Sequence, residues 1–115
     1  MAFPSTYNFN YYRGDSYEMV VRPKTSSNTA FPLTGYSAAF TIANLRGSGA
    51  NVTQYPATAV VNTGNNTVTC TITPAQGRPL APGTYVYDVQ ITNGTLIYTI
   101  LTGTITVTND ITGAI

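Results

Sequence analysis

Histidine and tryptophan are absent from the 115-residue sequence, cysteine occurs once, and only 8% of the residues are charged. The absence of histidine removes the commonest general base and the commonest metal ligand. The single cysteine, Cys70, excludes a disulfide within the chain, which fits synthesis in a reducing cytosol. We therefore expect no enzyme, no catalytic residues, no metal site and no cofactor.

The scarcity of charge excludes further classes of protein. Typical soluble domains carry about 25% charged residues, and here the five Lys and Arg are scattered over a chain of net charge +1. Basic residues scattered in this way do not form a patch that could bind phosphates, so no nucleic-acid partner is expected. No apolar run approaches the roughly 20 residues of a transmembrane helix, and the N-terminus lacks the features of a Sec signal, so no membrane partner is expected.

What is present is typical of β-structure. Thr, Val, Ile and Tyr alternate with polar residues, and Gly, Pro and Asn interrupt them at short intervals. The spacing predicts an all-β fold, an immunoglobulin-like β-sandwich of about seven strands, with a small barrel as the alternative. Residues 13–115 form a single sandwich domain in this interpretation, and residues 1–12 form an N-terminal arm or an edge strand.

Two hairpins are the clearest local predictions. Residues 84–92 and 95–102 flank Asn93-Gly94, which predicts a two-residue type I′ turn with Thr92 opposite Thr95. Gly103 then marks a bulge. Residues 57–62 and 66–73 form a second hairpin, whose alternation places Cys70 on the apolar face as a small buried hydrophobe. Further strands are expected at 7–12, 17–22 and 36–45, and a connecting turn, with one short helical turn, at 74–83.

Few residues offer chemistry. Asp88 lies in the middle of a predicted strand, where a buried carboxylate can mark a functional site. A structural Asp paired with an Arg or with backbone N–H groups is the favoured interpretation, since no second carboxylate lies beside it in sequence. The tetrapeptide that begins at Arg13 spells an integrin motif but also suits a plain turn. Three sequons, at Asn51, Asn65 and Asn93, would need a secretory route.

The N-terminal segment is the strongest candidate for binding. Four aromatic residues fall within six positions, with no charge before Arg13: Tyr7, Phe9, Tyr11 and Tyr12. Tyr and Phe are enriched in interface cores, where charge is depleted. The segment is either an edge strand packed on the chain's own core or an arm that docks on a neighbouring subunit, in which case these four residues are the protein-interface anchors.

Five segments in a fixed order also carry a family resemblance. They are Tyr12-Arg13-Gly14-Asp15-Ser16-Tyr17, Pro32-Leu33-Thr34-Gly35-Tyr36, Ile72-Thr73-Pro74-Ala75, Leu80-Ala81-Pro82-Gly83-Thr84-Tyr85-Val86-Tyr87-Asp88-Val89-Gln90-Ile91 and Thr102-Gly103-Thr104-Ile105-Thr106-Val107. This order resembles the small immunoglobulin-like domains of tailed-bacteriophage virion proteins, over residues 12–108. Each motif alone is ordinary strand and turn chemistry, and the resemblance lies in their order and spacing.

The resemblance implies a β-sandwich used for assembly, with no active site. Because the domain accounts for nearly the whole sequence, it suggests a capsid decoration (cement) subunit, with a tail, neck or baseplate component as the alternative. A virion-surface receptor or glycan-binding module is the alternative of another class. The expected partners are the major capsid protein or other virion structural proteins, and further copies in a homo-oligomer. The expected location is the virion, assembled in the host cytoplasm, and the low charge suits a subunit whose surface lies against neighbours.

Overall fold

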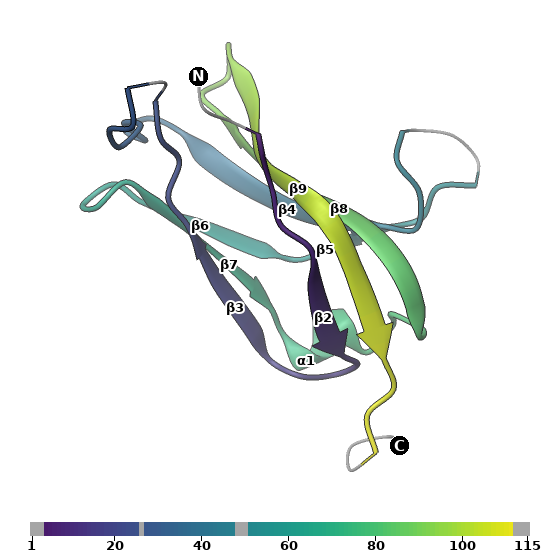
Figure 1. Ribbon diagram of the computed structural model, residues 1–115. Coiled ribbons are helices and arrows are strands. Elements are labelled where there is room, and N and C mark those ends of the chain that lie inside the picture. Colours follow the sequence, from purple (N-terminus) through teal and green to yellow (C-terminus); the bar gives the residue numbers. More distant parts are fainter. Residues whose placement is uncertain (1–3, 26, 48–50, 112–115) are drawn as a thin grey trace.

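The computed structural model describes residues 4–25, 27–47 and 51–111, which fold into two facing β-sheets (Figure 1). The larger sheet has six strands: β1 (Ser5–Thr6), β2 (Phe9–Tyr12), β4 (Ser37–Ala43), β5 (Gln54–Pro56), β8 (Gly83–Thr92) and β9 (Ile97–Thr108). The smaller sheet has three: β3 (Tyr17–Val21), β6 (Thr58–Asn62) and β7 (Thr67–Ile72). The predicted all-β sandwich is confirmed, and β1 and β5 are short additions to the expected strands.

The two sheets are joined on one side and open on the other. The larger sheet has the order β1-β9-β8-β4-β5, with β2 following β1 along β9, and the smaller has the order β3-β7-β6. The chain passes from β5 in one sheet to β6 in the other at Ala57, whose N–H donates to the Phe40 carbonyl at 2.9 Å. On the opposite side, β3 and the β1–β2 segment are the last strands of their sheets.

The core lies between the sheets and follows the alternation of the strands. Along β8, Tyr85, Tyr87, Val89 and Ile91 are buried, and the residues between them are half-buried. From β7, the side chain of Cys70 is completely buried, which confirms its interpretation as a small hydrophobe. Burying alternate side chains of both sheets provides the hydrophobic stabilisation of a sandwich.

The β6–β7 hairpin is confirmed, whereas the predicted register of the β8–β9 hairpin is wrong. Thr92 faces Ile97 rather than Thr95. The Asn93 side-chain oxygen accepts from the N–H groups of Thr95 and Leu96, at 3.0 and 2.8 Å. These two hydrogen bonds stabilise a four-residue loop, which moves the pairing by two residues and keeps the predicted faces at this end of the hairpin.

The bulge expected at Gly103 lies three residues earlier. Val89 pairs with Leu101 and Gln90 with Thr99, so Ile100 is the extra residue. Both Ile100 and Leu101 are buried as a result, and Leu101 joins the core face instead of the outer face. Before the bulge, the even-numbered residues of β9 face the core, and after it the odd-numbered residues do. One inserted residue moves every following side chain to the other face of the sheet.

The segment between β7 and β8 contains the short helix α1 (Pro74–Gly77), in agreement with the expected helical turn. Thr73 and Gln76 form a capping box. The Gln76 N–H donates to the Thr73 hydroxyl, and the Thr73 N–H donates to the Gln76 side-chain oxygen. This pattern satisfies two backbone donors that the first turn of a helix leaves unpaired. The helix lies at the end of the sandwich near β2 (Figure 1).

Candidate functional site

Of the four aromatic residues singled out in the N-terminal segment, two are buried and two are exposed. Phe9 and Tyr11 of β2 are 8% and 2% exposed and belong to the chain's own core, whereas Tyr7 and Tyr12 are 49% and 56% exposed. Strand β2 pairs in parallel with β9, with Tyr12 next to Thr108. Surfaces available to a partner therefore include Tyr7 and Tyr12 but not Phe9 and Tyr11.

Phe9 stands at the centre of an aromatic cluster that joins the two sheets. Its ring stacks on Tyr17 of β3, with 4.4 Å between centroids, and meets Tyr87 edge-on at 5.3 Å. The Tyr87 hydroxyl donates to the Tyr7 carbonyl at 2.5 Å. Burial raises the pKa of Tyr17 to about 12, with a further contribution from the neighbouring Tyr7. Burial raises the pKa of Tyr87 as well, so its hydroxyl keeps the proton that it donates to the N-terminal segment.

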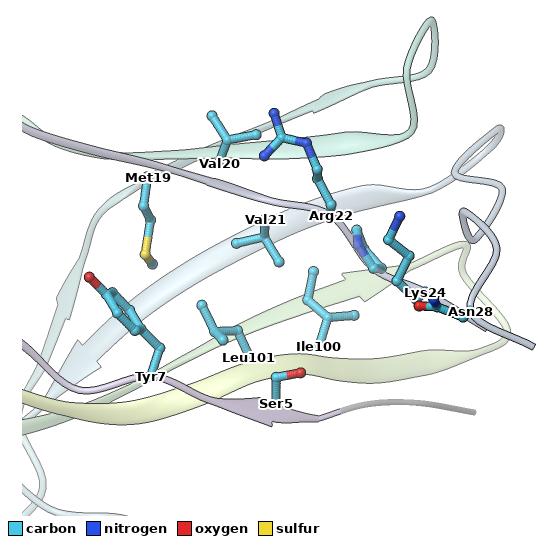
Figure 2. Close-up of a pocket in the computed structure, with 11 residues that line it drawn as sticks. Ser5, Tyr7, Met19, Val20, Val21, Arg22, Lys24, Asn28, Ile100 and Leu101 are labelled. Carbon is cyan, nitrogen blue, oxygen red and sulfur yellow. The ribbon is translucent and has the colours of Figure 1, made fainter. Parts of the chain in front are cut away.

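Next to this cluster, the open side of the sandwich contains a cleft of about 610 Å³. Met19 and Val21 of β3 point towards Tyr7, Leu101 and Ile100 across it (Figure 2). The side chains of Val20 in β3 and of Arg22, the residue after the strand, point to the opposite side from Met19 and Val21 (Figure 2). The bulge in β9 is what turns both Ile100 and Leu101 towards this apolar lining, so sequence periodicity could not reveal it.

The outer face of the larger sheet carries a second surface, which we call the threonine face. Its members are the outward threonines of β4, β8 and β9, namely Thr41, Thr84, Thr92, Thr99, Thr102, Thr104, Thr106 and Thr108. Tyr12 adjoins this face beside Thr108. Among the described strand residues of this sheet, Asp88 is the one charged side chain. The alternating threonines of residues 102–108 were the signal in the sequence for this surface.

Asp88 lies at the middle of the threonine face, between Thr41 and Thr102 in the strand register. Burial raises the pKa of its carboxyl above the ordinary value, and the positive charge of Arg46 lowers it in part. The Arg46 guanidinium donates to the Gly103 carbonyl at 3.2 Å. Asp88 and Arg46 line a hollow of about 220 Å³ on this face. Among the described residues, Asp88 and Arg46 do not form an ion pair, so the structural interpretation of Asp88 stays a prediction.

The remaining motifs have local structural roles. The Arg13 side chain donates to the Arg78 carbonyl at 2.7 Å, so it is engaged within the chain rather than presented beside Asp15. Asn65 accepts a hydrogen bond from Thr67, and Asn93 caps its loop. Over the described residues, no cluster of three potential metal ligands is found. No helix in that part of the chain is long and apolar enough to cross a membrane.

Comparison with known proteins gives no family. No family model matches the sequence, and no curated protein matches it. Among solved structures, InlP from Listeria monocytogenes is similar at 18% identity and a TM-score of 0.45, over 88% of this chain and 26% of that one. A family 123 glycoside hydrolase from Clostridium perfringens is similar at 16% identity and a TM-score of 0.42, over 92% and 23%. The chain spans about a quarter of the length of these proteins, and similarity at this level does not bear on function.

Proposed function

We propose that the chain is a structural protein of a tailed-bacteriophage virion, a capsid decoration subunit that stabilises the particle through protein–protein contacts. It acts in the virion, after assembly in the host cytoplasm, on the major capsid protein or another virion structural protein. The order of motifs over residues 12–108 and the β-sandwich fold support this proposal. A tail, neck or baseplate component is the alternative within the same class.

The threonine face is the observation that carries the proposal. Its longest strand, β9, has 12 residues and so extends about 40 Å at ~3.3 Å per residue. Four adjacent strands spaced by ~4.8 Å add about 15 Å of width. The face thus offers on the order of 600 Å², close to the ~800 Å² per partner of a specific interface. Threonine supplies both a methyl group and a hydroxyl. Asp88 and Arg46, which line the hollow on this face, are the charges that would have to lose water.

No catalytic activity is proposed. Asp88 is the one carboxylate on the face, and hydrolytic chemistry of the usual kind needs a second acid or base beside it. A surface that docks on a partner instead has to lose its water at a low cost in free energy, and burying an unpaired charge is unfavourable. The threonine face meets this requirement over most of its area, with Tyr12 as an aromatic anchor at its edge.

Co-sedimentation with particles tests the proposal. Capsids and tails of the phage that encodes the chain, prepared without it, are mixed separately with the purified protein. We expect saturable binding to capsids and a higher temperature of capsid disruption. Binding to tails alone would favour the alternative, and a folded protein that binds neither would overturn the proposal. Hits on a glycan array, without particle binding, would favour a glycan-binding module.

A matched pair of variants locates the contact. Thr106→Arg places a charge on the threonine face, well away from Asp88 in the strand register, and is expected to weaken capsid binding at least tenfold, because the guanidinium would be buried without a partner. Thr63→Arg makes the same change in the exposed turn between β6 and β7 and should bind as the unmodified chain does. Equal binding by both variants would exclude the threonine face as the contact.

A further inference from the structure

The free edge of β3 is an open site for strand pairing. Within the described residues, β3 is hydrogen-bonded on one side only, to β7. An edge strand presents unpaired N–H and C=O groups, and proteins usually protect such edges with a bulge, a proline or charged side chains. Glu18 is the one charged residue within β3. Strand β3 reads YEMVV, pairs with β7 in regular register, and has its first proline only at position 23. Its exposed edge is therefore suited to another strand.

Two charges are arranged symmetrically about Val20, one within β3 and one directly after its last residue. Glu18 and Arg22 are exposed, two residues before and two residues after it, and Val20 itself is 41% exposed. The two charges are about 13 Å apart along a strand, too far to pair with each other. Among the described residues, neither has an ion-pair partner. In a chain with nine charged residues, this arrangement places two opposite, unpaired charges on one short edge.

We propose that β3 pairs antiparallel with β3 of a second copy of this chain, about a two-fold axis at Val20. This register places Glu18 of each copy opposite Arg22 of the other, so both charges gain a partner at once. On the inner side it places Met19 opposite Val21 of the second copy, so each apolar pair extends the wall of the cleft. The two smaller sheets then form one continuous six-stranded sheet with the order β6-β7-β3-β3-β7-β6.

A second copy fits this edge better than an unrelated strand does. An isologous interface requires a surface that is complementary to itself, with residue i against residue j in both directions. The sequence from Glu18 to Arg22 has that property for charge and for apolar character. Opposite charges on directly facing positions of antiparallel strands stabilise the pairing, and like charges destabilise it. The pairing does not depend on the proposed attachment to a virion, which uses the threonine face of the other sheet.

Charge reversal tests the register. Sedimentation of the purified chain from about 10 μM to about 1 mM should show a reversible dimer. Glu18→Arg and Arg22→Glu should each weaken it about tenfold, since two facing pairs become repulsive in the symmetric dimer. The double variant restores both pairs and should dimerise within about threefold of the original. Asp15→Arg, the same charge change in an exposed turn, is the control and should dimerise normally.

A disulfide tests the position of the axis. Facing residues of antiparallel strands have Cα atoms about 4.5–5.5 Å apart, within the range that a disulfide bridges. Val20→Cys should therefore form a covalent dimer on mild oxidation. Val60→Cys, exposed on β6 at the far side of the same sheet, should not. A chain that stays monomeric at 1 mM, a dimer unaffected by both single reversals, or cross-linking that is equal in both cysteine variants would each overturn the proposal.

Discussion

The burial of a single side chain in this protein depends on which side of a sheet it occupies. Cys70 on the inner side of β7 is fully buried, whereas Asp88 on the outer side of β8 is half-buried. Both groups have raised pKa values, and burial is the main cause in each case. The consequences differ, since burial keeps the thiol in its ordinary neutral form but opposes the ordinary charge of the carboxylate.

Asp88→Asn is expected to raise the melting temperature slightly at pH 7. The raised pKa of Asp88 in the folded state means that its ionised form costs stability, and this cost disappears as the pH falls through the folded-state pKa. The difference between the variant and the original should therefore shrink towards pH 3. Thermal denaturation at several pH values measures it. A variant less stable at pH 7 would show that the attraction of the Arg46 charge outweighs the cost of burying the carboxylate.

The Cys70 thiol is expected to resist alkylation in the folded protein. Burial raises its pKa to about 12, so almost no thiolate is present at pH 8, and the sulfur is inaccessible. Reaction with a thiol reagent should occur on the timescale of unfolding in native buffer and within minutes in denaturant. Mass spectrometry gives the fraction modified. Rapid alkylation without denaturant would mean that β7 opens locally far more often than a buried central strand should.

At the scale of the elements, the N-terminal segment depends on a close contact with β9. A Cβ at Gly103 would overlap the Tyr7 carbonyl. The Tyr7 N–H donates to the Thr102 carbonyl at 2.9 Å, and the Thr104 N–H donates to the Asn8 side chain at 2.9 Å. The glycine thus permits the parallel strands β1 and β2 to approach β9 on either side of this contact.

Gly103→Ala is expected to destabilise the fold by about 1–3 kcal/mol, because the backbone of the N-terminal segment has to move away from β9. Amide hydrogen exchange should show the loss of protection concentrated at Tyr7 and along β2. Thr106→Ala, an exposed position three residues along the same strand, is the control and should change stability by less than about 0.5 kcal/mol. Similar losses in both variants would argue against the close contact as the cause.

On the scale of the whole molecule, the sandwich is closed at the β5–β6 crossing and open between β3 and the β1–β2 segment. The aromatic cluster of Phe9, Tyr17 and Tyr87 bridges the sheets at one end of the open side. The cleft lined by Met19 and Leu101 lies beyond it. The N-terminal segment therefore contributes to the stability of the molecule as well as to its surface.

Tyr11→Ala is expected to lower the free energy of unfolding by about 3–5 kcal/mol, as for other large aromatic core residues. Tyr11 is 2% exposed, and its hydroxyl donates to the Asp15 carbonyl at 2.6 Å. Tyr12→Ala, the neighbouring exposed position, should cost less than about 0.5 kcal/mol. Urea denaturation followed by circular dichroism measures both. If Tyr11→Ala were as stable as Tyr12→Ala, the segment would not be part of the core.

Local alternation was sufficient to predict the all-β sandwich, the β6–β7 hairpin and the burial of Cys70, because each depends on residues a few positions apart. The β8–β9 register was wrong because Asn93 closes a longer loop with its side chain. The bulge at Ile100 carries no local signal at all. The alternating threonines of the threonine face could be read from residues 102–108 of the sequence. The sequence did not show that strand pairing brings Thr41 and Tyr12 onto the same face.

The features that concern partners arise from pairings between distant parts of the chain. Strand β2 lies beside β9 across about 95 residues, and this pairing turns Phe9 and Tyr11 inward while leaving Tyr12 on the threonine face. Likewise, the order β3-β7-β6 leaves the edge of β3 free among the strands that the structure describes. The symmetry of Glu18 and Arg22 about Val20 is present in the sequence, but the proposed pairing is possible only because no described strand lies beside that edge of β3.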